Sequence, residues 1–296
     1  MTLTTFGLSA ALGMLLLLLA AGLWCRREKL SYGVWIRLCV LAIPLAFVGS
    51  RLLFSLFAFF NGDMPSLLNT LTIQDGGASV TGAFIGVVIA AALTEKLCRV
   101  PGGTLLDGVT LGMPLALICE RLAEPLHELG IGRPVDTEFL YFLGSATDDR
   151  HPVFIYEAVV ALLILLALLW MVRRPVKHRG NVLLTFMVLY GCPQMLLESL
   201  RDDAHMVIYF IRINQIAALL MAVVAFVIWL VRWIRKGAKL PFVLLACAAV
   251  AAGIALGVVQ EFAVDSNMNL LLEYAIMALS TAVIAVTALL VRGKAE

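Results

Sequence analysis

Arginine and glutamate occur together at two places where an apolar segment of the chain ends. Arg121 and Glu124 are three residues apart, and so are Glu198 and Arg201. Residues at this spacing share one face of a helix, so the two members of each pair can meet. A guanidinium group binds an oxyanion through two parallel hydrogen bonds, which the ammonium group of lysine cannot do. The two pairs therefore predict recognition of a phosphate or a carboxylate.

A third polar group opens another apolar segment. His151 directly precedes a proline, which suits the first turn of a helix, and Tyr156 and Glu157 follow about one turn later. Asp148 or Asp149, just before this group, would cap the free amides of the helix. Histidine and glutamate are side chains that accept protons in catalysis. This segment is therefore a candidate source of a general base.

A structural interpretation of the same residues stays open. The arginines would then pair with nearby acids as interhelical ion pairs. His151 would serve only the start of its helix, and Tyr156 and Glu157 would form one hydrogen-bonded unit.

The composition predicts that these groups are positioned by helices in a membrane. Of the 296 residues, 62% are hydrophobic and 14% are charged, whereas a soluble domain carries roughly a quarter charged residues. A bilayer core about 30 Å thick needs about 20 apolar residues per spanning helix. We expect an all-α, polytopic integral membrane bundle without a large soluble domain. Its nine apolar segments lie at about 6–24, 34–60, 79–98, 105–125, 152–172, 181–200, 208–234, 241–262 and 269–291.

The basic residues predict the orientation. When the loop after each odd-numbered segment is placed in the cytoplasm, that side gathers most lysines and arginines and few acids, as the positive-inside rule requires. This predicts an uncleaved first helix with the N-terminus outside and the C-terminus inside. The outer half keeps nearly all the acids and no lysine. Its cations are Arg51, Arg121, Arg133, Arg150, Arg201 and Arg212.

The depth of the polar residues predicts that they share one layer. At 1.5 Å per residue, Arg51 lies roughly 25 Å from the inner end of the second segment. The fourth and sixth segments carry Arg121 and Arg201 near their outer ends, and the fifth begins there with His151. A charge at the bilayer centre costs about 2.5–3.5 kcal/mol on insertion scales. Several such charges at one depth therefore predict a common polar cavity near the outer face.

The cysteines and histidines predict no metal site. The six cysteines stand singly in or beside apolar runs, without a Cys-x-x-Cys pair, and the four histidines are scattered. We interpret the cysteines as small apolar side chains that fill space. No metal, other cofactor or nucleic-acid partner is expected.

In their order and spacing, the motifs of this chain resemble those of the bacterial prolipoprotein diacylglyceryl transferases, over about residues 5–235. Residues 151–157 are similar to the family's His-Pro-x-Gln-x-Tyr-Glu, and Glu198 to Arg201 to its Glu-x-x-Arg. Arg121 falls in the Gly-Arg-x-Gly-Asn signature, and Gly132 at a later glycine. The other similar segments are Gly49 to Leu52 (Gly-Ala-Arg-Leu), Thr81 to Gly86 (His-Gly-Gly-Leu-Ile-Gly) and Gln215, which opens the last shared span.

The chain also departs from this pattern. The family's early tyrosine is Phe6, the histidine of His-Gly-Gly is Thr81, and the asparagine of the arginine signature is Glu124. The glutamine of the fifth-span motif is Phe154. The spans at about 241–291 have no counterpart in the family's seven-helix core. We therefore expect a seven-helix transferase-like core at 1–236 and a two-helix membrane extension at 237–296.

The resemblance implies a reaction and roles for the residues. Family members transfer the diacylglyceryl group of phosphatidylglycerol to the cysteine thiol of a prolipoprotein signal peptide at the outer face of the bacterial plasma membrane. Arg121 and Arg201 would hold the phosphate, with Glu198 orienting Arg201 and Arg51 in a supporting place. His151, Glu124 or Glu157 would act as the base. The substrate-binding residues implied are Arg51, Tyr156, Glu157, Gly132 and Thr81.

The sequence bears on three other functions. The replacements at Phe6, Thr81 and Glu124 favour a catalytically altered relative that binds or moves an anionic lipid or lipopeptide. A secondary transporter would show interrupted helices and an inverted repeat, and no such repeat is visible. An intramembrane serine protease is poorly supported, because Ser9 has no suitably placed histidine.

Overall fold

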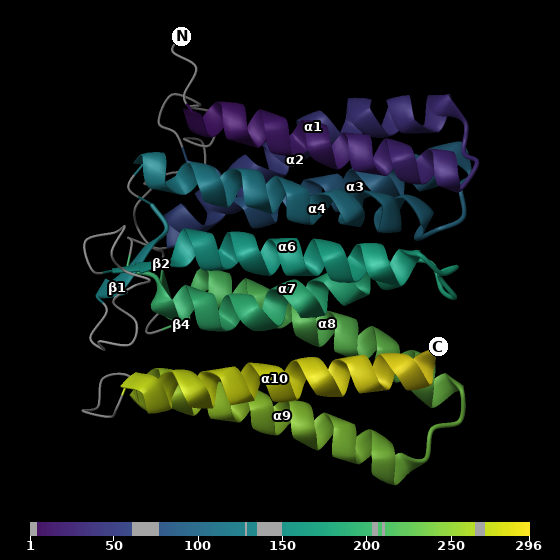
Figure 1. Ribbon diagram of the computed structural model, residues 1–296. Coiled ribbons are helices and arrows are strands. Elements are labelled where there is room, and N and C mark those ends of the chain that lie inside the picture. The colour runs from purple at the N-terminus through teal and green to yellow at the C-terminus, as the bar shows by residue number, and fades with distance from the viewer. Residues whose placement is uncertain are drawn as a thin grey trace. The chain divides into compact units, whose positions relative to one another are not determined.

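The computed structural model describes residues 5–60, 77–127, 129–134, 150–202, 207–208, 211–263 and 270–296, and is shown in Figure 1. Within these residues the chain forms nine α-helices and four short strands. The helices are α1 Thr5–Arg27, α2 Tyr32–Phe60, α3 Val80–Cys98, α4 Thr104–Ala123, α6 Val153–Val172, α7 Asn181–Leu200, α8 Ile213–Arg235, α9 Leu240–Ala263 and α10 Leu270–Ala295, with a 3₁₀ turn, η3, at Glu124–His127. The strands are β1 Ile131–Pro134, β2 Arg150–Pro152, β3 Val207–Ile208 and β4 Ile211–Arg212.

The nine helices coincide with the nine predicted apolar segments, which confirms the all-α, polytopic fold. Eight of the helices in the described part of the chain are long and apolar enough to cross a membrane. The ninth, α4, has 20 residues but contains Asp107, Glu120 and Arg121. Outward-facing side chains are apolar: Leu23 on α1 and Val40 on α2 are 66% and 65% exposed. Such surfaces are stable only against lipid. The N-out, C-in orientation and the passage of α4 through the bilayer stay predictions.

At two places a strand takes residues that were predicted to open a helix. Helix α8 begins at Ile213 instead of about residue 208, because β3 and β4 form an antiparallel pair in which Val207 lies opposite Arg212. Pro152 ends β2, and α6 begins one residue later, at Val153. The predicted caps Asp148 and Asp149 lie outside the described residues.

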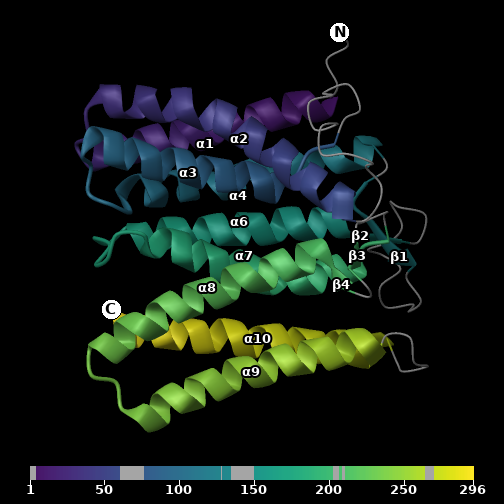
Figure 2. The same cartoon turned by 180° about the vertical axis from the view of Figure 1, so that it is seen from behind.

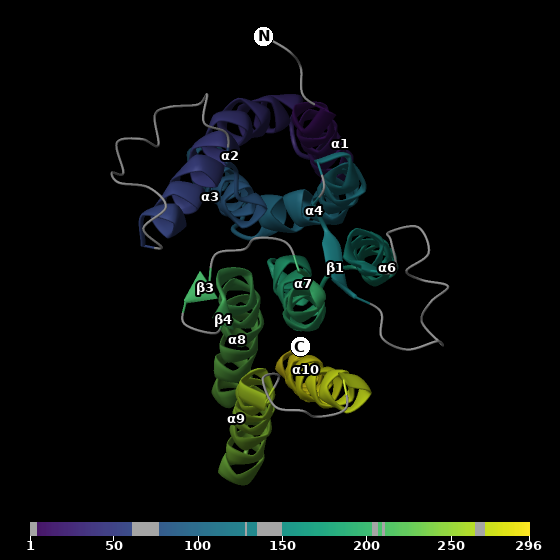
Figure 3. The ribbon, with the colours of Figure 1, turned by 90° about the vertical axis from the view of Figure 1, so that its left-hand side faces the viewer.

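The chain forms two compact units. Unit 1 comprises Met1–Leu129 and Ala161–Leu183, and unit 2 comprises Gly130–Val160 and Leu184–Glu296. Within unit 1, α1 contacts α2 and α4, and α3 contacts α2 and α4, so these four helices form a ring (Figure 3).

Glycines set the approach of α2 to α3. A Cβ atom on Gly49 would lie within 2.5 Å of the carbonyl oxygen of Gly82, and a Cβ atom on Gly82 would meet the carbonyl oxygen of Gly49 equally closely. Only residues without side chains allow the two backbones to come this near. Gly49 and Gly82, which belong to the segments Gly49 to Leu52 and Thr81 to Gly86, therefore have a structural role: they allow α2 and α3 to pack closely.

Two buried acids of unit 1, Glu95 and Asp107, accept hydrogen bonds from backbone amides at the starts of helices. The carboxylate of Glu95 accepts hydrogen bonds from three backbone amides at the start of α4, at 2.6–3.2 Å. The carboxylate of Asp107 accepts from three backbone amides at the start of α7, at 2.8–3.3 Å. The first amides of a helix have no partner within the helix. Each acid therefore satisfies donors that would otherwise be buried and unpaired.

Unit 2 has its own core around α8 and α10. Trp229 of α8 and Ile284 of α10 are completely buried, together with Val188 of α7. The hydroxyl of Ser280 on α10 donates to the carbonyl oxygen of Gly253 on α9 at 2.7 Å. The two helices contact each other, and Figure 2 shows them closest near the end of α9 and the start of α10. The two last helices therefore form a packed hairpin with α8 as its support.

Candidate active site

The most connected group of polar side chains in unit 2 is centred on Glu157 of α6. One of its carboxylate oxygens accepts a hydrogen bond from Arg201 at 2.9 Å, and the other accepts from the amide of Gln194 at 2.6 Å. Gln194 also donates to Glu198 at 3.3 Å, and Asn214 at the start of α8 donates to Glu198 at 3.2 Å. We call these five residues the Glu157 network.

Four of the five residues of the Glu157 network are buried, and only Asn214 is exposed. Glu198 is completely buried, Arg201 is 3% exposed and Glu157 is 4% exposed. Buried ionised groups need both a partner of opposite charge and hydrogen bonds to their remaining atoms. The two amide side chains fill this second need, which fixes the guanidinium of Arg201 and both carboxylates in one arrangement.

Strands β1 and β2 position the segment that carries Arg201 of the Glu157 network. Gly132 of β1 forms a bridge with Arg201, and the side chain of Arg150 in β2 donates to the carbonyl oxygen of Gly132 and to Asp202. A Cβ atom on Gly132 would lie 2.8 Å from the Cβ atom of His151 and 2.8 Å from the carbonyl oxygen of Leu200. Gly132 is therefore needed for the close approach of β1 to the segment that carries Arg201.

His151 and Tyr156 form a second pair in unit 2. The Nδ1 atom of His151 lies 3.3 Å from the hydroxyl of Tyr156, and the histidine is 5% exposed. When Nδ1 carries the proton and donates it to Tyr156, Nε2 is the ring nitrogen that carries the lone pair. The pair thus has the geometry that a general base oriented by a second side chain requires.

Arg212 is an addition to the residues predicted from the sequence, along with Gln194 and Asn214. Its guanidinium donates to the carbonyl oxygen of Arg201, and its Nη1 atom is buried and has no hydrogen-bond partner among the described residues. The sequence placed Arg212 among the outer cations but gave it no role. Gln194 was detectable, because it is an amide within an apolar segment and lies one helical turn before Glu198.

In unit 1, Arg121 and Glu124 form the ion pair that their spacing predicts. The guanidinium of Arg121 contacts the carboxylate of Glu124, and Glu120 lies 3.9 Å from the same nitrogen. Both Arg121 and Glu124 are less than a tenth exposed. Glu124 begins the turn η3, so the pair stands where α4 ends.

Arg51 and Thr81 lie at the junction of α2 and α3. Arg51, 7% exposed, donates to the carbonyl oxygen of Gly77 at 2.6 Å, and the hydroxyl of Ser50 accepts from the backbone amide of Ser79 at 2.9 Å. Thr81 is half-buried in the first turn of α3. Arg51 therefore orders the segment that leads into α3.

A pocket of about 120 Å³ lies inside unit 1, next to both groups. Ser50 and Glu120 provide polar atoms, while the other lining side chains are apolar, among them Ala10, Ala83 and Phe84. It is large enough for part of an acyl chain or for a small apolar side chain.

The predicted site residues thus fall into two sets. Unit 2 brings together Glu157, Glu198 and Arg201, with His151 and Tyr156 shortly before Glu157 in the chain and Gly132 bridged to Arg201. Unit 1 holds Arg121, Glu124, Arg51 and Thr81. That both sets face one polar cavity stays a prediction.

Comparison of the sequence with those of known proteins shows the family to which the chain belongs. A family model described as prolipoprotein diacylglyceryl transferase matches residues 1–231. The chain is 26% identical over 203 residues to the phosphatidylglycerol–prolipoprotein diacylglyceryl transferase of Clostridioides difficile, covering 68% of this chain and 79% of that protein. It is 26% identical over 233 residues to the enzyme of that name from Geobacillus kaustophilus, covering 74% and 86%. For the Oceanobacillus iheyensis enzyme the identity is 25% over 234 residues, covering 75% and 81%. The chain belongs to the prolipoprotein diacylglyceryl transferase family.

Proposed function

We propose that this protein transfers the diacylglyceryl group of phosphatidylglycerol to the cysteine thiol of a prolipoprotein. The sulfur attacks the glycerol carbon that bears the phosphate, a carbon–sulfur bond forms, and the carbon–oxygen bond to the phosphate breaks. The thiol proton passes to a base, and glycerol phosphate leaves. The observation that carries the proposal is Arg201, held at a fixed position by the buried Glu157 network, in a chain whose family acts on this substrate.

Two arginines are assigned to the phosphate. Charge builds up on the leaving phosphate as the carbon–oxygen bond breaks, and fixed guanidinium groups stabilise this charge without having to reorganise. Arg201 is held by Glu157, and Arg121 by Glu124. Arg51 and Thr81 support the adjacent junction, where the pocket beside Glu120 would take an apolar part of one substrate.

His151 is the base that the contacts favour. Both oxygens of Glu157 are engaged, by Arg201 and Gln194, and Glu124 is paired with Arg121. His151 is positioned by a neutral partner, the hydroxyl of Tyr156, and histidine is the side chain that most often serves as a general base. Glu198 helps to fix the arrangement through Gln194 and Asn214.

The proposal includes a location. A multi-pass protein of the bacterial plasma membrane, oriented with the N-terminus outside, would present both sets of residues toward the outer leaflet. Phosphatidylglycerol would arrive from the surrounding membrane lipids, and the second substrate would be the signal peptide of the prolipoprotein. The basic residues at the opposite helix ends support this orientation.

The test is rescue of a bacterium depleted of its own transferase, with the mass of a reporter prolipoprotein as the readout. We expect a gain of one diacylglyceryl group in thioether linkage, and its loss in Arg121→Ala and Arg201→Ala. Correct insertion and amount are checked on the same membranes. A well-inserted protein that leaves the reporter unmodified would refute the transfer and indicate a relative that only binds lipid.

A further inference from the structure

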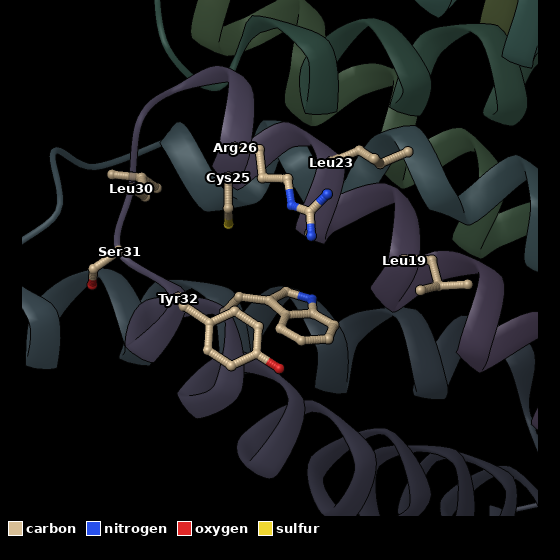
Figure 4. A pocket seen from close by; sticks show the side chains of 9 residues that line it. Leu19, Leu23, Cys25, Arg26, Leu30, Ser31 and Tyr32 are labelled. Atoms are coloured by element: carbon tan, nitrogen blue, oxygen red, sulfur yellow. The ribbon is translucent and has the colours of Figure 1, made fainter.

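A second cavity of unit 1 lies at the opposite ends of α1 and α2 from Arg51 and Arg121, where the basic residues gather. It has a volume of about 400 Å³ and lies at the turn between the two helices (Figure 4). The predicted active-site residues do not line it. It therefore needs an explanation of its own.

One side of this cavity is polar and cationic. Arg26, Ser31 and Tyr32 line it, and Figure 4 shows Arg26 and Tyr32 on the two successive helices that enclose it. None of these three side chains has a hydrogen bond or ion pair with the residues that the structure describes. The neighbouring Arg27 differs, because its guanidinium lies over the ring of Trp24, 5.2 Å from the centroid. No acidic side chain lines the cavity, so its only charge is positive.

The other side is apolar. Trp35 forms a wall: its indole nitrogen donates to the carbonyl oxygen of Leu18 at 2.9 Å, and its ring lies 5.2 Å from that of Tyr32. Leu19 and Leu23 complete this side. Outside the cavity, exposed apolar side chains continue along both helices, at Leu8, Leu12 and Leu15 of α1 and at Ile36, Val40, Ile43 and Phe47 of α2.

We propose that this cavity binds the head group of an anionic phospholipid, as a site separate from catalysis. Its phosphate would accept hydrogen bonds from Arg26, Ser31 and Tyr32, and its acyl chains would lie along the two apolar stripes. A free anion would leave the apolar walls uncovered, and a fatty acid or detergent chain would leave the guanidinium without a partner. In the orientation predicted above, the lipid belongs to the cytoplasmic leaflet.

The substrate of the proposed reaction is itself an anionic phospholipid, so total lipid binding cannot test this site. The readout is instead the fluorescence of Trp35. The full-length protein is placed in phosphatidylcholine vesicles that contain increasing amounts of phosphatidylserine with brominated chains, and Trp35→Phe defines the share of the quenching that belongs to Trp35. Brominated phosphatidylcholine serves as the zwitterionic comparison.

We expect brominated phosphatidylserine to quench Trp35 at a lower mole fraction than brominated phosphatidylcholine. Hydrogen bonds to charged groups contribute about 1.5–3 kcal/mol, so Arg26→Gln raises the half-quenching mole fraction about tenfold or more. The charge-matched control Arg27→Gln leaves it unchanged, because Arg27 points at Trp24. Tyr32→Phe, which keeps the aromatic wall but removes a hydrogen bond to the phosphate, also raises it about tenfold and provides a test should Arg26→Gln fail to fold.

Three results would overturn the inference. One is equal quenching of Trp35 by the two lipids. Another is an equal effect of Arg26→Gln and Arg27→Gln, which would indicate only general attraction of the basic helix ends. The third is loss of quenching in excess inorganic phosphate, which would assign the cavity to a free anion. Transfer activity is measured on the same variants and is expected to persist, so failure of this inference is distinguishable from failure of the proposed reaction.

Discussion

Glu157 and Arg201 are 44 residues apart in the chain and form an ion pair of 2.9 Å, in which the two side chains are 2% and 3% exposed. Removing one member of a buried pair leaves the other charge without compensation, which destabilises a protein by about 3–5 kcal/mol. We expect Glu157→Gln to lower the free energy of unfolding by about 3 kcal/mol and to abolish transfer, because Arg201 loses its position. Thermal unfolding in detergent micelles and the prolipoprotein mass assay measure the two effects.

The matched control is the pair of Arg150 and Asp202. It has a similar length, 2.8 Å, but its side chains are 40% and 44% exposed. Exposed pairs contribute about 0–1 kcal/mol, so Asp202→Asn should change stability little. Equal losses in Glu157→Gln and Asp202→Asn would mean that burial does not set the strength of the first pair.

The ion pair of Glu157 and Arg201 could not be predicted from the sequence, although the helices that carry it could. The helices were predictable, because about 20 apolar residues per span is a property of each segment alone. Pairs one helical turn apart, such as Arg121 and Glu124, were predictable for the same local reason. The contact of Glu157 with Arg201 depends on how α6 approaches α7, and nothing in either segment encodes that approach alone. The sequence therefore suggested Glu198 as the residue that orients Arg201, and the structure adds Glu157.

The second prediction concerns the base. General base catalysis contributes about 10²–10⁴-fold to a rate. We expect His151→Gln to lower the transfer rate at least about a hundredfold at an unchanged KM for phosphatidylglycerol, and Tyr156→Phe to lower it less, since only the orientation of the ring is lost. Initial rates with purified protein and a synthetic lipoprotein peptide measure both. A normal rate in His151→Gln together with an inactive Glu124→Gln would move the role to Glu124.

A third prediction follows from the buried acids at the basic helix ends. Asp107 caps the start of α7, and caps contribute about 0.5–2 kcal/mol. We expect Asp107→Ala to lower the free energy of unfolding by about 2 kcal/mol, at the upper end of this range because its partners are buried. Glu28→Ala removes an acid near the same end of unit 1, one for which the structure records no cap, and should have little effect. Similar melting temperatures for the two variants would contradict the capping role.

The last prediction concerns the helices beyond the family match, which ends at residue 231. Removal of 237–296 should leave transfer intact, because every assigned residue precedes the cut, but should lower stability by uncovering Trp229 and its neighbours. A single substitution at the contact between α9 and α10 tests the packing of these helices without removing them. A Cβ atom on Gly253 would lie 2.8 Å from Ile284, whereas one on Gly293 meets nothing within 4 Å. Overpacking costs about 1–3 kcal/mol, so Gly253→Leu should destabilise the protein and Gly293→Leu should not. Loss of transfer in the truncated protein, at normal insertion, would show that α9 and α10 take part in the site.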